Sequence, residues 1–275
     1  MAHIAGISNS RIIFTPQGSD LLVLPDKNSL VRKFLLHKLA KIAFITADSN
    51  LLLEKALVLS PNLKKNKLKI IQNGIPLADI DKLIRKRENF KNRNIDICWI
   101  RGVSNVYQFE YFLELLKELS NFSTSKINVY IISAYGKITL PKQIYKYENI
   151  SIKLLPRLNS EDFLSTLFNS KVVISIPKSD SSPRSVYEAL ILGCTIFATN
   201  LECFNWIPSK LKSKFIYCSY DLKKDSLKLI HEIENFKSND FNTFMKEKHS
   251  NFRNALDYKK IADKYLKIFE KVQNS

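Results

Sequence analysis

The stretch VVISIPKSDSSPRSVYEALILGCTIFATN, from Val172 to Asn200, decides the fold of this chain. Its β-branched run at 172–176 is typical of a strand that is buried on both faces. A polar loop follows, and the sequence then predicts a helix with Ser182 as its N-cap and Gly193 as its stop. A second strand is expected at 195–199. Strand, loop, helix and strand in this order predict one unit of an open parallel sheet.

Two carboxylates mark this unit. Glu188 is the only Asp, Glu, Lys, Arg or His between Ser185 and Asn200, and a lone carboxylate among apolar residues is costly unless something satisfies it. Asp180 stands in the loop before the helix. The N–H groups at the helix start, where Pro183 is expected in the first position, carry the positive end of the helix dipole. We expect an anion site flanked by two hydroxyl-binding acids. Alternatively, Asp180 is a loop acid and Glu188 a core acid paired with a backbone group.

The spacing of these acids resembles the donor-site signature of the retaining glycosyltransferases of family 4. In that signature two acids lie eight positions apart, and an Ala follows the second. The resemblance implies that Asp180 faces the donor sugar and that Glu188 holds the nucleotide ribose. Asp180 replaces the usual Glu, which shortens its reach by one methylene. The resemblance also implies that the helix start binds the diphosphate, through Ser182, Pro183, Arg184 and Ser185.

A second part of the resemblance concerns cations. Arg101 follows a predicted strand, where the family has an Arg on the donor phosphates. The family has a Lys about five residues later, but this chain has Tyr107 near that point. Lys178 or Arg184 is our candidate replacement for that Lys. Arg157 lies in the loop that meets the base in the family. The alternative for Arg101 is a surface salt bridge.

The first half of the chain adds weaker signals. A strand at 12–15 and the turn at 15–20 resemble a family loop near the interdomain cleft, although they also fit an ordinary turn. The sequence TADS, a helix and KIIQNGI resemble the end of the family's first domain. The candidate residues of this cleft or acceptor side are Gly18, Ser19, Asp20, Asn73 and Gly74. A cationic amphipathic helix is expected at 30–41, either on a membrane or as a solvated face over a core.

The resemblance implies an α/β, GT-B-like fold with two Rossmann-like parallel-sheet domains and a C-terminal helix that crosses back. We expect a partial N-terminal, acceptor-side domain with a linker at 1–92, and a nucleotide-sugar-binding domain at 93–240. The C-terminal helix is expected at 241–275. The family's first strands, with a glycine-rich loop and a His, have no recognisable counterpart. The first domain is therefore expected to be incomplete, through truncation or because a partner supplies the rest.

Composition bounds the class of protein. The 275 residues are 45% apolar and 11% aromatic, as in a globular chain. The net charge is +17 and the pI is near 9.6, which suits nucleic acid or an anionic membrane with anionic substrates. The four cysteines lack C-x-x-C spacing, and no signal peptide or membrane span is recognisable. A cytoplasmic protein is expected, with peripheral contact at the inner face of the membrane as an option.

The resemblance implies a hexosyltransferase. The donor would be a nucleoside-diphosphate sugar, and the acceptor a glycan or a polyprenyl-linked glycan in surface polysaccharide biosynthesis. The four histidines show no metal-binding spacing, so no metal or further cofactor is expected. The alternatives are an inactive donor-binding remnant, one subunit of a split transferase, and a nucleic-acid-binding α/β protein. Only the charge favours the last.

Overall fold

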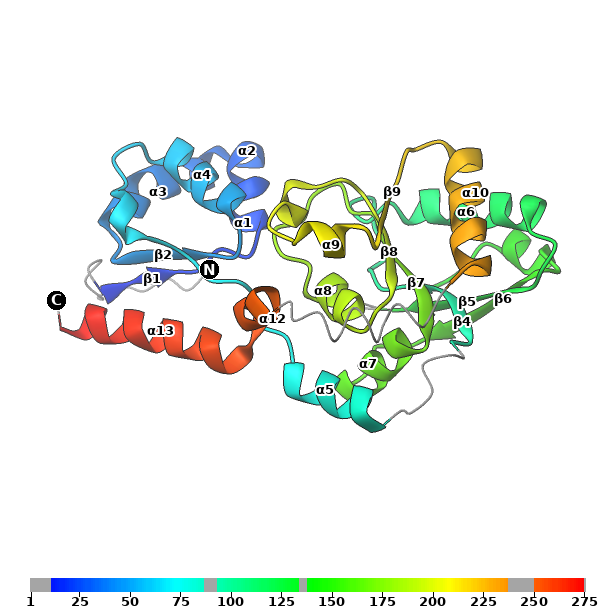
Figure 1. Ribbon diagram of the computed structural model, residues 1–275. Helices are drawn as coiled ribbons and strands as arrows, with labels where there is room; N and C mark the ends of the chain where they lie inside the picture. Colours follow the sequence, from blue (N-terminus) through cyan, green and yellow to red (C-terminus); the bar gives the residue numbers. More distant parts are fainter. Residues whose placement is uncertain (1–10, 87–92, 134–137, 237–249, 275) are drawn as a thin grey trace. The chain divides into compact units, whose positions relative to one another are not determined.

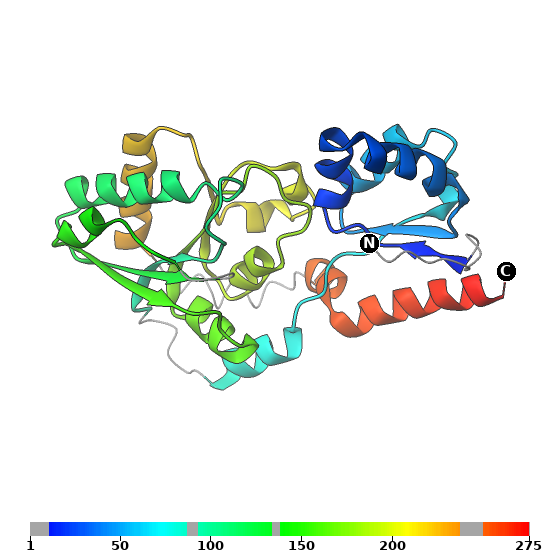
Figure 2. The same ribbon diagram turned by 180° about the vertical axis from the view of Figure 1, so that it is seen from behind.

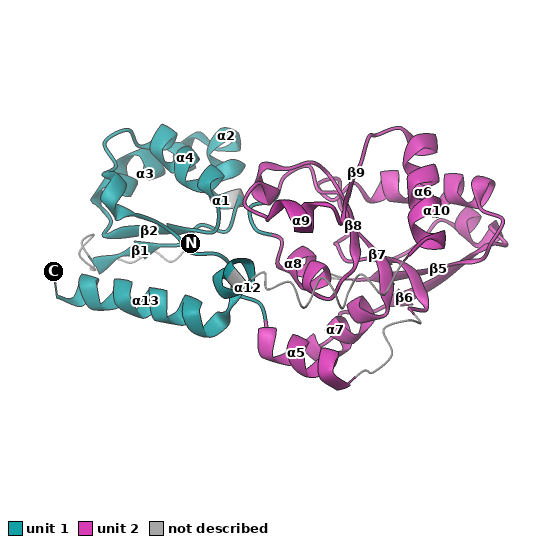
Figure 3. Ribbon diagram, in the orientation of Figure 1, with its two compact units in different colours: residues 1–75, 180–182, 251–275 teal, residues 76–179, 183–250 magenta. Residues whose placement is uncertain are grey.

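The computed structural model describes residues 11–86, 93–133, 138–236 and 250–274 (Figure 1). The chain divides into two compact units (Figure 3). Unit 1 comprises residues 1–75, 180–182 and 251–275, and unit 2 comprises residues 76–179 and 183–250.

Unit 1 contains a three-stranded parallel sheet in the order β1-β2-β3. Its strands are β1 (Ile13–Phe14), β2 (Phe44–Ala47) and β3 (Leu68–Ile70). The helices that follow these strands in sequence are α1 (Ser19–Leu22), α2 (Leu24–Lys27), α3 (Ser29–Lys38), η2 (Leu39–Lys41), α4 (Asn50–Leu59) and η3 (Lys65–Lys67). Ser49 caps α4, because its Oγ accepts from the N–H of Leu52.

Two apolar clusters cover the two faces of this sheet. On one side, helices α1, α3 and α4 pack against Ile45 of β2. Each contributes a buried leucine to this cluster: Leu21, Leu35 and Leu52, respectively. On the other side, α13 (Tyr258–Gln273) packs Ile261 and its neighbours onto the sheet. Figures 1 and 2 show α3 and α4 on one face of the strands and α13 on the other. The C-terminal helix thus belongs to the first sheet, as the sequence predicts.

The described part of the C-terminal segment forms two helices. Helix α12 (Ser250–Leu256) ends before Asp257, whose Oδ1 accepts from the N–H groups of Lys259 and Lys260 and so caps α13. Residues 241–249 of the expected helix lie outside the described residues.

Unit 2 is built on a six-stranded parallel sheet in the order β6-β5-β4-β7-β8-β9. The strands are β4 (Ile95–Trp99), β5 (Ile127–Ile132), β6 (Ile150–Leu155), β7 (Ser170–Ser175), β8 (Thr195–Ala198) and β9 (Phe215–Tyr217). The chain adds β5 and β6 on one side of β4, and then β7, β8 and β9 on the other. This reversal creates a topological switch point between β4 and β7, where open α/β sheets bind ligands.

The helices of unit 2 cover both faces of this sheet (Figure 1). Its α-helices are α5 (Leu77–Lys86), α6 (Phe109–Phe122), α7 (Ser160–Phe168), α8 (Arg184–Ile191), α9 (Ser209–Lys212) and α10 (Leu222–Glu234). Two 3₁₀ turns are η4 (Lys142–Lys146) and η5 (Glu202–Phe204). Helix α6 packs against α10, and α7 packs against α8. Trp99 stacks on Phe112 in the core, with ring centroids 4.6 Å apart.

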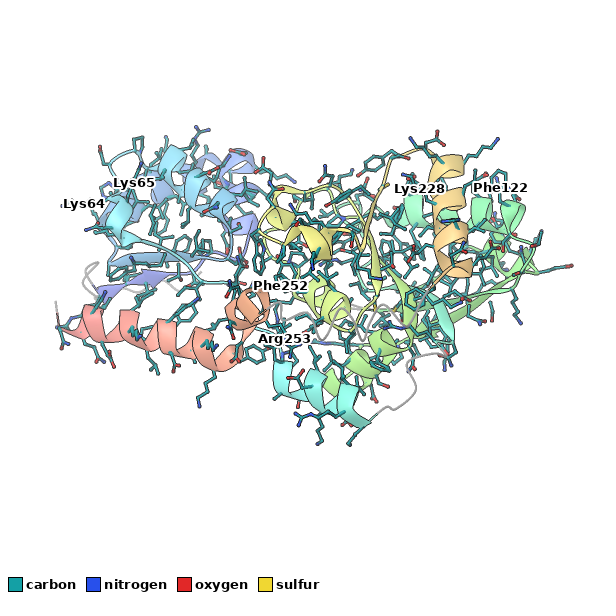
Figure 4. The ribbon with its side chains drawn as sticks, in the orientation of Figure 1. Lys64, Lys65, Phe122, Lys228, Phe252 and Arg253 are labelled. Atoms are coloured by element: carbon teal, nitrogen blue, oxygen red, sulfur yellow. The ribbon has the colours of Figure 1, made fainter. Side chains whose placement is uncertain are left out.

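A buried carboxylate shapes the loop after β9. Asp225 of α10 accepts hydrogen bonds from the N–H and the hydroxyl of Ser219 and from the hydroxyl of Tyr111. Lys228, labelled in Figure 4, lies 3.4 Å from the same carboxylate. These partners compensate the cost of removing Asp225 from water and fix the loop at one end of the sheet.

The decisive β7–α8–β8 unit is present, with one correction. Helix α8 begins at Arg184, and its N-cap is Pro183, so the predicted N-cap Ser182 is wrong. Pro183 has ψ 86°, which is not helical, and the hydroxyl of Ser182 bonds Gln72 Oε1 instead. The predicted stop is confirmed. Gly193 has φ +79°, and the N–H groups of Gly193 and Cys194 bond the carbonyls of Leu190 and Ala189 in a Schellman motif.

One helix was not foreseen. The linker was expected at the end of the range 1–92, but α5 occupies 77–86, and residues 87–92 lie outside the described part. Its apolar residues Leu77, Ile80, Leu83 and Ile84 recur at helical spacing, so the sequence did carry the signal.

Candidate functional site

A cavity of about 280 Å³ lies in unit 2, at the carboxyl ends of β4, β5 and β6. Residues from each strand end and from the first turn of α8 line it: Ile100, Arg101, Gly102, Tyr107, Ile132, Ser133, Arg157, Leu158, Phe163 and Ser185. This is the edge of the sheet at which its topology predicts a ligand. The lining contains two arginines and no Asp or Glu, so the cavity suits an anion.

Arg101 is held in the wall of this cavity. Its Nε donates to Ser175 Oγ at 2.8 Å, and its guanidinium carbon lies 5.6 Å from the centre of the Tyr107 ring. The indole N–H of Trp99 donates to the Arg101 carbonyl at 2.6 Å, which fixes the backbone at the strand end.

The loop that carries Tyr107 is tied to the end of β7. The N–H of Lys178 donates to the carbonyl of Val106 at 2.7 Å, and Gln108 Nε2 donates to the carbonyl of Ile176 at 2.7 Å. Gln108 has φ +58°, in the left-handed region that non-glycine residues seldom adopt. The bonds from its side chain stabilise that conformation.

Glu188 is a buried acid beside a cation. It is 7% exposed, and its Oε1 lies 3.9 Å from Nη2 of Arg184, one turn earlier on α8. Burial raises the pKa of the Glu188 carboxyl to about 7, and the Arg184 charge opposes this only in part. Glu188 is not among the described residues that line the cavity, whereas Ser185 of the same helix is.

The predicted donor-side residues fall into three groups. Arg101, Arg157 and Ser185 line the cavity. Lys178, Pro183, Arg184 and Glu188 lie in unit 2 outside that lining. Asp180 and Ser182 are grouped with unit 1, and Asp180 Oδ1 accepts from the N–H of Ser181.

The candidates of the first half lie in the loops of unit 1. Gly18 has φ +88°, which favours glycine, and Asp20 Oδ2 accepts from the N–H of Gln17 in the turn before α1, which begins at Ser19. A Cβ on Gly74 would lie 2.2 Å from the ring of Tyr258, so this glycine admits the start of α13. These contacts explain the two glycines without a ligand.

Asp48 is a buried acid that sequence reasoning did not select. Asn73 Nδ2 donates to its Oδ2 at 2.9 Å, while its Oδ1 has no hydrogen-bond partner among the described residues. Burial raises the pKa of the Asp48 carboxyl to about 6. Asp48 directly precedes Ser49, the N-cap of α4, and an acid at such a position is usually exposed. The local sequence therefore gave no sign that Asp48 is buried.

Within the described ranges, no three His, Cys, Asp or Glu side chains are grouped so that they could hold a metal ion. No described helix is both long and apolar enough to cross a membrane.

Comparison with known proteins places the fold. No family model matches the chain, and no curated protein sequence matches it. Solved structures do match. HepE of Anabaena, in complex with UDP-glucose, has a TM-score of 0.65 at 14% identity over 96% of this chain and 72% of its own. Trehalose 6-phosphate synthase of Burkholderia multivorans has a TM-score of 0.68 at 11% identity, over 96% and 67%.

TarM of S. aureus, in a complex that contains UDP, has a TM-score of 0.63 at 13% identity. The match covers 94% of this chain and 50% of TarM, so this chain spans half of that longer protein. These likenesses show that the chain has the GT-B fold, with its Rossmann-like parallel sheets. The predicted fold class is thereby confirmed.

Proposed function

We propose that this chain is a retaining glycosyltransferase of the family 4 type, with a nucleoside-diphosphate sugar as donor. The observation that carries the proposal is the cavity at the carboxyl ends of β4, β5 and β6, which Arg101, Arg157 and Ser185 of the first turn of α8 line together. Cations and helix N–H groups are the partners that a diphosphate needs. The UDP and UDP-glucose named for TarM and HepE support the same ligand class.

Each candidate residue has a role in this proposal. Arg101 neutralises the leaving diphosphate together with the N–H groups at the start of α8, which provides charge stabilisation without a metal ion. Glu188 bonds the ribose hydroxyls, and Asp180 bonds hydroxyls of a hexose-type sugar. Lys178 or Arg184 supplies a second cation. Arg157 lies at the base.

The acceptor is proposed to be a glycan or a polyprenyl-linked glycan in surface polysaccharide biosynthesis. Helix α3 supports contact with an anionic membrane, because Leu30 is 74% exposed and Phe34 is 47% exposed on it. Lys33, His37 and Lys41 are spaced with them along the same side of the helical turn. Apolar side chains among cations are typical of helices that lie in a membrane interface.

The first test is a calorimetric titration with UDP, GDP, ADP and CMP at pH 8, where most of Glu188 is ionised. We expect saturable binding of one diphosphate. Glu188→Ala should weaken it about tenfold or more, since a hydrogen bond to a charged group contributes about 1.5–3 kcal/mol. Glu234→Ala, which removes an exposed acid from the end of α10, is the matched control and should change the affinity less than about twofold.

The outcomes separate the candidate functions. A folded sample that binds none of the four nucleotides contradicts the donor site. Binding without transfer or hydrolysis of the corresponding nucleotide sugar favours a donor-binding remnant or one subunit of a split transferase. Steeply salt-dependent binding of duplex DNA or RNA, without nucleotide binding, favours the nucleic-acid alternative.

A further inference from the structure

We infer that Tyr107 and Ser175 are positioning residues that hold the guanidinium of Arg101 in the cavity wall. The guanidinium carbon of Arg101 lies over the Tyr107 ring, 5.6 Å from the ring centre. The hydroxyl oxygen of Ser175 accepts a hydrogen bond from Arg101 Nε at 2.8 Å. The inference rests on the proposed function only in so far as Arg101 is taken to bind a diphosphate.

The two contacts restrain different freedoms of the arginine. The Ser175 hydroxyl fixes the edge of the guanidinium that lies nearest the backbone, and the Tyr107 ring restricts the plane of the group. An unrestrained arginine loses about 2 kcal/mol of side-chain entropy when a ligand orders it. An arginine that is already ordered avoids much of that cost.

Ser175 and Tyr107 are themselves fixed by the fold. Ser175 is fully buried at the end of β7. Tyr107 precedes Gln108, whose left-handed backbone is stabilised by bonds from its Nε2 to the Ile176 carbonyl and to the hydroxyl of Tyr220, at 2.7 and 2.9 Å. A strained residue of this kind costs about 1–3 kcal/mol and persists only where its surroundings enforce it. The strain here lies directly beside the Arg101 contact.

Tyr107 contributes an uncharged side chain to the cavity wall beside Arg101. Among the described residues that line the cavity, the cations are Arg101 and Arg157. A tyrosine at 107 adds no charge. It holds Arg101 in place, whereas a lysine at this position would add a further, mobile cation.

A ligand-free measurement tests the positioning directly. In ¹⁵N-labelled protein, the Nε–H signal of Arg101 is assigned by its loss in Arg101→Lys. We expect slow exchange with water and a ring-current shift. Ser175→Ala should speed the exchange, Tyr107→Leu should abolish the shift, and Tyr107→Phe should keep it. An Arg101 signal that exchanges as fast as that of the exposed Arg32, with no ring-current shift, would overturn the inference.

Nucleotide affinity supplies the second readout. Tyr107→Leu should weaken UDP binding about 5- to 30-fold, the equivalent of about 1–2 kcal/mol for a partly desolvated cation–π contact. The loss should be smaller for UMP, and Tyr107→Phe should restore UDP binding to within about twofold. Unchanged UDP affinity in a folded Tyr107→Leu protein would refute the positioning role. If the wild type binds no nucleotide, the proposed function fails, and the Nε–H signal still decides the role of Tyr107 and Ser175.

Discussion

Glu188 is a carboxyl group that folding removes from water. Its side chain is buried on α8, and the nearby Arg184 guanidinium is half-exposed and 3.9 Å away. Burial therefore outweighs the ion pair, and the pKa of Glu188 rises from 4.5 to about 7. The folded chain takes up a proton that the unfolded chain has released between these two pH values. Its free energy of unfolding consequently falls as the pH rises from about 4.5 to about 7.

Replacing Glu188 by Gln should remove this dependence. At pH 8 we expect Glu188→Gln to have a free energy of unfolding higher than the wild type by up to about 3 kcal/mol, while at pH 4.5 the two should agree. Asp48 shifts in the same direction in both proteins, so it cancels in the comparison. Urea unfolding followed by the fluorescence of Trp99 and Trp206, the two tryptophans, reports on unit 2 alone. An equal difference at both pH values would show that Glu188 is not the buried acid described.

At the scale of elements, helix α3 carries a prediction of its own. Its inner side is buried through Leu35, whereas Leu30 and Phe34 are exposed four positions apart. Vesicles that contain anionic lipid should bind the protein, and added salt should weaken the binding. The double change Leu30→Ser with Phe34→Ser should weaken it about tenfold or more, because each side chain contributes about 1.5–3 kcal/mol when fully buried.

Leu227→Ser, on α10 of unit 2, removes an exposed leucine of similar accessibility and should leave vesicle binding unchanged. Sedimentation with vesicles of neutral and anionic lipid measures all three proteins. Undiminished binding of the α3 variant, or no binding of the wild type at low salt, would rule out α3 as the contact.

Elements whose signals lie close together in the sequence could be predicted. The β7–α8–β8 unit has an apolar strand, a polar loop, an isolated acid and a glycine stop, and all these signals act within 30 residues. The capping of helix α7 (Ser160–Phe168) is equally local, because the Asn159 side chain accepts from the N–H of Asp162. The start of α8 was placed one residue early, because the ψ angle of Pro183 depends on contacts beyond the local sequence.

The candidate site was predictable only in part, for a related reason. Arg101, Arg157 and Ser185 follow strand or loop ends, and parallel topology brings such ends to one edge. Ser175 and Gln108 gave no such signal. Their partners are 74 and 68 residues away in sequence, so only the folded chain reveals them.

For the whole molecule, the net charge of +17 favours anionic partners without choosing among them. The two arginines among the described residues of the cavity lining favour the proposed diphosphate over a nucleic acid as the ligand. The carboxyl edge of the six-stranded sheet is therefore the part of the molecule on which the account depends.

A crystal structure of the chain with the diphosphate that titrates best tests this claim most directly. We expect difference density for the nucleotide in the cavity of unit 2. Its phosphate oxygens should lie within hydrogen-bond distance of Arg101 and of the N–H of Ser185. Density for the nucleotide elsewhere, or an empty cavity at a concentration that saturates the titration, would contradict it.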